Sequence, residues 1–174
     1  MTAELIVFTN GPEETRQLGE RLGEVLKPGD LVTLMGDLGA GKTTFTQGVG
    51  AGLGVQTYLR SPTFTLVNEY RLDNGASLLH VDGYRLGETM HEAMLEADTF
   101  GMAEMLDDAQ TIVIIEWADR VQEMLTDDRL EVRIASGPDE AQRCFTFSAT
   151  GPRSRTALRA LHDKTQENPE ISPA

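Results

Sequence analysis

Residues Leu31 to Phe45, LVTLMGDLGAGKTTF, are the most informative segment for the fold, because they join an apolar run to a glycine-rich loop and then to a helix-compatible segment. The first five residues, Leu31 to Met35, show no alternation of polar and apolar side chains. This pattern is typical of a strand buried on both faces of a parallel sheet. The part from Gly36 to Thr43 matches the phosphate-loop pattern G-x-x-x-x-G-K-[ST]. We therefore predict a three-layer α/β fold with a mainly parallel central sheet and antiparallel hairpins.

Each residue type in this loop has a physical role in binding a nucleotide. Glycines let the backbone turn tightly, so that the N–H groups of residues 39–43 point at phosphates, and the following helix adds the positive end of its dipole. We expect Lys42 to reach the β- and γ-phosphates and the Thr43 hydroxyl to bind Mg²⁺. A glycine-rich surface turn with an unrelated lysine is the alternative. The expected cofactor-binding residues of the loop are Gly39, Ala40, Gly41, Lys42, Thr43 and Thr44.

Length and composition indicate one domain. The chain has 174 residues, of which 40% are hydrophobic, enough for one core. We assign residues 1–162 to this domain and expect the polar tail, residues 163–174, to be disordered. We find no leader pattern and no apolar run near the roughly 20 residues that a membrane span needs, so we expect a soluble, cytoplasmic protein without a membrane role.

Charge and cysteine usage narrow the function further. The 15 Lys and Arg residues against 28 Asp and Glu residues give a net charge of −13. Such a surface repels a phosphate backbone, so a nucleic-acid role would pass through a partner. Cys144 is the single cysteine, which excludes an internal disulfide, and its alternating surroundings favour a packed strand cysteine over a reactive thiol.

Hydrophobic periodicity and turn residues predict the other elements. Asn10 followed by Pro12 indicates a capped helix start. The methionines of the segment 88–108 are interpreted as core residues, with an adaptable partner surface as the alternative. The predicted elements are a strand at 4–8, a helix ending at 27–29, a hairpin of 63–72 with 77–82, one or two helices in 88–108 broken near Gly101, a strand at 111–116, a short helix at 119–125, a hairpin of 129–135 with 143–149, and a helix at 154–162.

Two carboxylates end apolar strands and are candidates to complete the site. Glu116 follows the run Thr111 to Ile115, and Asp82 follows Leu78 to Val81. Ligands bind at the carboxyl ends of strands in open α/β sheets. We expect Glu116 to be the metal-side carboxylate and Asp82 to orient or deprotonate the attacking water, and the alternative is that they cap helices.

Four neighbouring residues carry weaker signals. His80 and His91 are better explained as packing residues than as ligands. Trp117 follows Glu116 and either walls the site or packs in the core. Arg85 either contacts phosphate or pairs with an acidic neighbour.

Four motifs occur in one order: GDLGAGKTTF at 36–45, SPTFTLVNEY at 61–70, HVDGYRL at 80–86 and IIEWADR at 114–120. Together they resemble the TsaE (YjeE) family, bacterial P-loop ATPases of tRNA threonylcarbamoyladenosine biosynthesis. The resemblance spans about residues 5–150. It implies that ATP and Mg²⁺ are the cofactors and that TsaD and TsaB are the partner proteins. TsaD is the transferase acting beside the anticodon, and ATP hydrolysis resets the TsaD–TsaB assembly, so that tRNA is reached only indirectly.

The resemblance also implies roles for individual residues. Lys42 and Thr43 fall on the phosphate lysine and the Mg²⁺ threonine, Glu116 falls on the Mg²⁺-associated carboxylate, and Asp82 falls on the aspartate needed for hydrolysis. Thr15 lies where the family places a threonine near the adenine.

The segment 61–70 corresponds to a switch-like segment in the family. Its hydroxyls and its exposed strand edge are candidates to sense the γ-phosphate or to meet a partner. The family often continues Glu-Trp with Pro or Gly and then Glu, whereas this chain has Ala118 and Asp119.

Two other functions compete with the ATPase interpretation. A small P-loop kinase would need arginines in a lid, but residues 88–110 contain no Lys or Arg. A non-catalytic ATP sensor would not need the full set of Lys42, Thr43, Asp82 and Glu116. A GTPase is disfavoured because the chain lacks an Asn-Lys-x-Asp motif.

Overall fold

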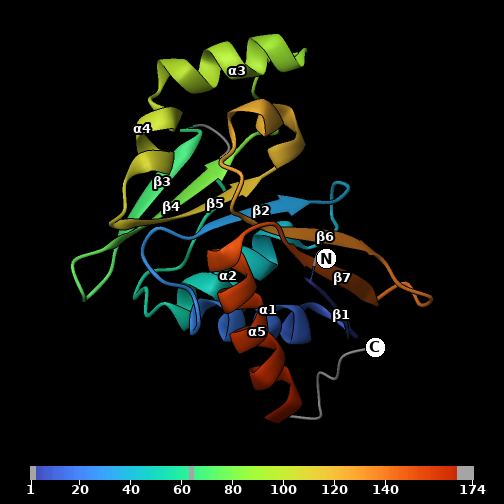
Figure 1. Cartoon of the computed structure of the whole chain (residues 1–174). Coiled ribbons are helices and arrows are strands. Elements are labelled where there is room, and N and C mark those ends of the chain that lie inside the picture. The colour runs from blue at the N-terminus through green and yellow to red at the C-terminus, as the bar shows by residue number, and fades with distance from the viewer. Residues whose placement is uncertain (1–2, 63–64, 168–174) are drawn as a thin grey trace.

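The computed structural model describes residues 3–62 and 65–167. These residues form a three-layer structure, in which one sheet is the middle layer (Figure 1). The strand order is β1-β7-β6-β2-β5-β4-β3. The four central strands β6, β2, β5 and β4 run parallel, whereas β7, β1 and β3 run antiparallel to their neighbours. The strands are β1 (Ala3–Thr9), β2 (Leu31–Met35), β3 (Val67–Arg71), β4 (Ser77–Asp82), β5 (Thr111–Glu116), β6 (Leu130–Ser136) and β7 (Arg143–Ala149).

Helices cover both faces of the sheet. The helices α1 (Pro12–Gly23), α2 (Lys42–Gly52) and α5 (Pro152–Glu167) pack on one face, where they share a core with inward side chains such as Phe45 and Phe145. The helices α3 (Met90–Thr99), α4 (Met102–Asp107) and the 3₁₀ helix η1 (Ala118–Met124) pack on the other face. This arrangement confirms the predicted three-layer α/β class with a parallel centre and antiparallel hairpins.

Glycines bring α1 and α2 into direct backbone contact. A Cβ at Gly19 would lie 2.2 Å from the carbonyl oxygen of Phe45, and a Cβ at Gly48 would lie 2.0 Å from that of Arg16. Gly23 and Gly52 show the same relation one turn later. Any side chain at these positions would push the helices apart, so the glycines fix α1 close against the helix that begins at the phosphate loop.

Several predicted boundaries need correction at the N-terminal half. The residue before α1 is Gly11, which has no side chain to cap the helix, and the N–H groups of Asn10 donate to Glu14, so Asn10 is not the cap. The helix ends at Gly23, earlier than expected. Strand β3 begins at Val67 because Leu66 has a left-handed φ of 64°, which interrupts the extended backbone. Positions 63 and 64 of the predicted strand lie outside the described residues.

The C-terminal helix is longer than predicted. Helix α5 runs to Glu167, with Thr165 buried and the Lys164 ammonium bonded to the Glu24 carboxylate. The prediction that a disordered tail begins at 163 is therefore wrong for 163–167, and residues 168–174 lie outside the described part. The hairpins, both buried strands and the break at Gly101 are confirmed.

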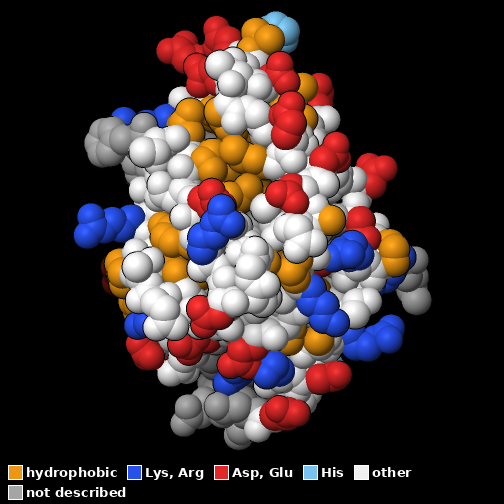
Figure 2. All heavy atoms as spheres, turned by 90° about the vertical axis from the view of Figure 1, so that its left-hand side faces the viewer, with side chains coloured by type: hydrophobic (Ala, Val, Ile, Leu, Met, Phe, Trp, Pro, Cys, Tyr) orange, Lys and Arg blue, Asp and Glu red, His pale blue; other side chains and the backbone are white. Residues whose placement is uncertain are grey.

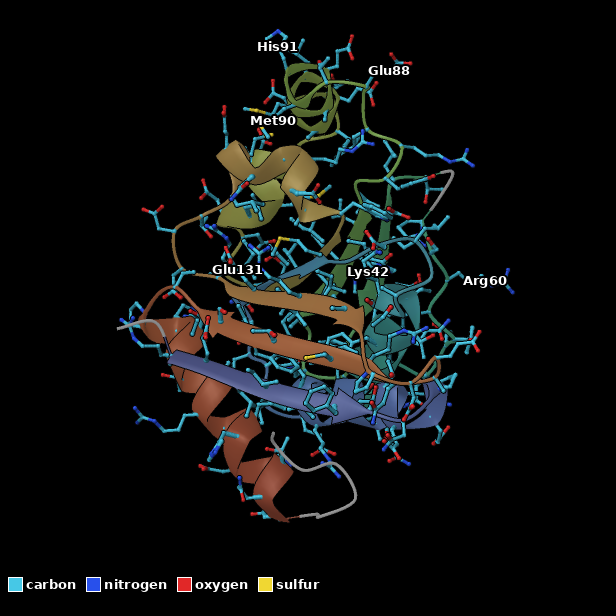
Figure 3. All side chains as sticks on the ribbon, turned by 90° about the vertical axis from the view of Figure 1, so that its right-hand side faces the viewer. Lys42, Arg60, Glu88, Met90, His91 and Glu131 are labelled. Carbon is cyan, nitrogen blue, oxygen red and sulfur yellow. The ribbon has the colours of Figure 1, made fainter. Side chains whose placement is uncertain are left out.

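The methionines differ in their environments. Met102 is buried, whereas Met90 is 42% exposed and lies with His91 at the outer end of the molecule (Figure 3). In the described part of the chain, no helix is both long and apolar enough to cross a bilayer.

Candidate functional site

The phosphate loop sits between the end of β2 and the start of α2. Gly39 and Gly41 have φ values of 79° and 105°, in the left-handed region that favours glycine. Gly41 is the residue before α2, and the first turn of this helix contains no acidic side chain. No side chain in this turn therefore neutralises the positive end of the helix dipole. Such a helix N-terminus favours the binding of an anion.

Lys42 lies in the interior beside this loop, unlike the outward-pointing Arg60 (Figure 3). Its ammonium donates to the carbonyl oxygens of Gly36 and Asp37 at 2.5 and 2.8 Å, and lies 4.0 Å from the centroid of the Trp117 ring. Burial lowers the pKa of Lys42, while the charge of Glu116 opposes that change. The lysine is thus held by its own loop and an aromatic face, with buried acids nearby.

Glu116 ends β5 and is almost completely buried. The Thr43 hydroxyl lies 3.3 Å from both carboxylate oxygens, and Thr46 Oγ1 lies 3.4 Å from Oε1. The buried His80 places its Nε2 2.9 Å from the same Oε1. The loop threonine and the strand-end carboxylate therefore lie side by side.

Asp82 is paired with Glu116 in the parallel register of β4 and β5, so the two carboxylates end neighbouring strands. Its Oδ2 accepts from the Ser61 hydroxyl at 3.0 Å and its Oδ1 accepts from the Tyr84 N–H at 3.0 Å. Asp82 therefore has a fixed orientation, set by the segment before β3 and by the turn after β4.

One cavity of about 360 Å³ connects these groups. The Trp117 ring, whose centroid lies 5.0 Å from that of Tyr84, forms part of its wall. Trp117 has a left-handed φ of 57°, which is uncommon without glycine and turns its ring toward Lys42. The lining residues are Leu38, Gly39, Gly41, Lys42, Thr43, Thr44, Ser61, Asp82, Tyr84, Glu116 and Trp117.

A second cavity of about 120 Å³ lies against the same loop and shares Gly39, Gly41 and Thr44 with the first. It is also lined by Thr15 and by Arg143 at the start of β7. Thr15 is buried, and its hydroxyl makes a hydrogen bond with the Thr9 hydroxyl at 2.8 Å. Ala40 also lines this second cavity.

The structure brings most of the sequence-predicted site residues together. The predicted Lys42, Thr43, Thr44, Asp82 and Glu116 line one cavity. His80 was interpreted as a packing residue, but its imidazole contacts Glu116. The spacing of His80 could have indicated this contact, because a residue two positions before Asp82 lies on the same face of the strand as Asp82.

Tyr84 and Thr46 were missed as site neighbours, whereas Ser61 belongs to the switch-like segment 61–70, whose hydroxyls were candidates for the site. Ser61 enters the site from a segment far from β4 in sequence, and no local periodicity predicts that contact. Cys144 is partly buried on β7, opposite Phe8 and Ala135, in agreement with a packed strand cysteine.

Comparison with known proteins identifies relatives over most of the chain. A family model described as threonylcarbamoyl adenosine biosynthesis protein TsaE matches residues 9–145. The tRNA threonylcarbamoyladenosine biosynthesis protein TsaE of Bacillus subtilis is 40% identical over 157 residues, covering 89% of this chain and 93% of that protein. The protein with the same name from Streptomyces coelicolor is 41% identical over 147 residues, covering 82% and 95%.

A solved structure also resembles the chain. The crystal structure of YdiB from Bacillus subtilis superposes with a TM-score of 0.74 at 34% identity, covering 97% of this chain and 99% of that one. The similarity therefore includes the fold as well as the motifs around the loop.

Proposed function

The chain belongs to the TsaE family of tRNA threonylcarbamoyladenosine biosynthesis, and from this premise we propose that it is a Mg²⁺-dependent ATPase of that pathway. In this proposal it hydrolyses ATP to reset a TsaD–TsaB assembly, and it is not the threonylcarbamoyl transferase. The observation that carries the proposal is the convergence of Lys42, Thr43, Asp82 and Glu116 on one cavity beside the phosphate loop.

The two cavities support a division of the nucleotide between them. Phosphates fit the larger cavity, where the α2 N-terminus and Lys42 supply positive charge. The smaller cavity, lined by Thr15 and Arg143, is left for the nucleoside. On phosphate binding, the Lys42 ammonium would exchange its bonds with Gly36 and Asp37 for phosphate oxygens.

The residues present fit a Mg²⁺ ion held jointly with the phosphates. Thr43 and Glu116 offer hard oxygen atoms 3.3 Å apart, the ligand type that Mg²⁺ prefers. Within the described residues, no three His, Cys, Asp or Glu side chains form a metal site by themselves, which agrees with a cation that relies on phosphates and water. When bound, the ion neutralises charge on the phosphates.

Asp82 is placed to act on water. Its carboxylate lines the larger cavity and is oriented by Ser61 and Tyr84. We assign to it the role of holding the attacking water and accepting its proton, since phosphoryl transfer needs a positioned nucleophile. Glu116, surrounded by hydroxyls and imidazole, takes the metal side.

The charge of the protein supports an indirect role toward tRNA. The net charge is −13, and Figure 2 shows Asp and Glu side chains around the upper end of one face, where α3 lies. A partner that binds tRNA itself, such as the TsaD–TsaB assembly, is required in this proposal.

The test is Mg²⁺-dependent ATP hydrolysis by the purified chain, alone and with TsaD and TsaB added, with Lys42→Ala as the blank. We expect turnover that requires Mg²⁺, is lost in Lys42→Ala and rises when both partners are present. If TsaD and TsaB did not change the turnover, the proposed action on their assembly would be contradicted, whereas the proposed ATPase activity would stand.

The same assay separates the two rivals. A kinase would transfer the phosphoryl group to a metabolite and release little inorganic phosphate without it. A non-catalytic sensor would bind ATP and release none. Segment 88–110, which forms α3 and α4, has no Lys or Arg to clamp a transferred phosphoryl, so we expect neither result.

A further inference from the structure

His80 has a contact pattern that packing alone does not explain. The ring is fully buried, its Nε2 lies 2.9 Å from Glu116 Oε1, and its Nδ1 has no hydrogen-bond partner within the described residues. An ionised carboxylate only accepts hydrogen bonds, so this contact requires the proton on Nε2. A leucine would fill the space without burying an unpaired nitrogen, so the polar ring points to a role for its Nε2–H.

The bond acts on one oxygen of Glu116. Oε1 has contacts with Nε2 of His80 and with the hydroxyls of Thr43 and Thr46, whereas the described contact of Oε2 is with Thr43. The two threonine contacts are long, at 3.3 to 3.4 Å, so the imidazole makes the shortest of these contacts. Glu116 is thus anchored through Oε1, and the Thr43 hydroxyl is the described partner of Oε2.

The strand register explains why this anchor is rigid. His80 is paired with Ile114 across β4 and β5, so its ring reaches Glu116 diagonally on the same face. Both strands lie in the parallel centre of the sheet, and both residues are buried. The His80 ring therefore has little freedom to move, and it holds the Glu116 carboxylate in one orientation.

We propose that His80 is a positioning residue, which holds the Glu116 carboxylate in the orientation that serves Mg²⁺ beside Thr43. This inference rests on the proposed function. It predicts that loss of the Nε2–H weakens the metal-dependent part of nucleotide binding and leaves the metal-independent part unchanged. Residues that orient metal ligands in this way typically change metal affinity by about 10- to 100-fold when replaced.

Two amide variants form a matched pair for the test. His80→Gln carries an N–H donor about as far from the backbone as Nε2, whereas the amide of His80→Asn stops near the position of Nδ1. Both are polar and smaller than the imidazole, so they differ mainly in the reach of the donor. Leu78→Ala, on the same strand and the same buried face, controls for loss of core volume.

The measurement is calorimetric titration of the full chain with ADP, in EDTA and over a series of Mg²⁺ concentrations. We expect His80→Asn to need about 10- to 100-fold more Mg²⁺ for the same gain in ADP affinity. We expect His80→Gln and Leu78→Ala to keep the wild-type Mg²⁺ requirement, and all variants to bind ADP equally in EDTA.

Other results would overturn the inference. An unchanged Mg²⁺ requirement in His80→Asn, an equal loss in both amide variants, or an equal loss in EDTA would each show a packing role only. If the wild type itself failed to bind ADP, the proposed function would be contradicted. This result differs from those that contradict only the role of His80.

A measurement on the wild type keeps the test independent of variant folding. The chain has three histidines, and the other two, His91 and His162, are exposed or half-exposed. In nitrogen-15 NMR spectra we expect the His80 proton on Nε2, and a shift of this resonance when Mg²⁺ is added to the ADP complex. A proton on Nδ1, or no response to Mg²⁺, would contradict the proposal.

Discussion

The two ends of the parallel strands carry buried or half-buried aspartates and glutamates with different partners. At the carboxyl ends of β4 and β5, Asp82 and Glu116 meet hydroxyls, an imidazole and a backbone N–H around a cavity. At the amino ends, Asp30 before β2 bonds the Lys27 N–H and Arg153, and Asp128 before β6 accepts from the first turn of α5. The first pair faces a cavity, and the second pair ties chain segments together.

The partners of an acid distinguish the carboxylates at the cavity from those that tie chain segments together. Burial alone does not do so: burial raises the pKa of Asp30, opposed by the Lys27 N–H and by Arg153, yet its partners are fixed parts of the fold. The carboxylates at the cavity instead have partners, such as the Thr43 and Ser61 hydroxyls, that can exchange for water or a cation. The predictions below test this contrast.

Replacement of Asp82 should change ATP hydrolysis more than replacement of any other acid at these strand ends. In Asp82→Asn the side chain keeps its shape but cannot accept a proton, so we expect ATP hydrolysis to fall by about 10²- to 10⁴-fold while ATP binding is retained. Hydrolysis and calorimetric binding assays check this. Asp30→Asn is the matched control at the opposite end of the strands, and we expect it to hydrolyse ATP normally. Normal hydrolysis in Asp82→Asn would refute the assignment.

The next effect concerns the metal side. In Glu116→Gln we expect the Mg²⁺ concentration needed for nucleotide binding to rise by at least the roughly 10- to 100-fold that is typical when a residue orienting a metal ligand is lost. The change also removes the charge that most opposes the fall of the Lys42 pKa, so that pKa should drop further. Nucleotide titrations at several Mg²⁺ concentrations measure the first effect. A Mg²⁺ requirement equal to that of the wild type would place the metal elsewhere.

Features that are continuous in the sequence, or that end a buried strand, could be predicted from the sequence. The apolar run at Leu31 and the loop ending at Thr43 form one continuous segment, so the strand, the loop and the helix were all predictable. Glu116 and Asp82 were found because each ends a buried strand, and parallel strands end at one edge.

Contacts between distant segments were not predictable. The Ser61 hydroxyl meets Asp82 from 21 positions away in the sequence, and no local pattern predicts the left-handed backbone of Leu66 between them. The close packing of α1 on α2 depends on glycines at Gly19 and Gly48 that meet only in the folded state. The roles of the site residues in ATP and Mg²⁺ binding stay predictions.

A smaller effect is expected at Ser61. In Ser61→Ala the carboxylate of Asp82 loses one hydrogen bond, worth about 1 kcal/mol, so we expect ATP turnover to fall about fivefold. The Mg²⁺ requirement should not change, since this bond orients Asp82, whereas the contacts that hold Glu116 come from Thr43, Thr46 and His80. Ser61→Thr keeps the hydroxyl and should stay near wild-type turnover. A changed Mg²⁺ requirement in Ser61→Ala would mean that the two carboxylates do not act separately.

The smallest effect lies at the opposite end and concerns stability alone. Burial works to raise the pKa of Asp128, but hydrogen bonds from Ser154 and Arg153 outweigh it and hold the pKa below its usual value. An acid with a lowered pKa in the folded state stabilises the fold above its unfolded pKa, near 4, and this contribution disappears as pH falls through the folded value. Asp128→Asn should therefore lower the free energy of unfolding by about 1 kcal/mol at pH 7, as for a lost helix cap. In urea titrations this gap should close as pH falls below about 4, while ATP turnover at pH 7 stays normal. A gap that persists in acid would mean that Asp128 stabilises α5 through shape and not through charge.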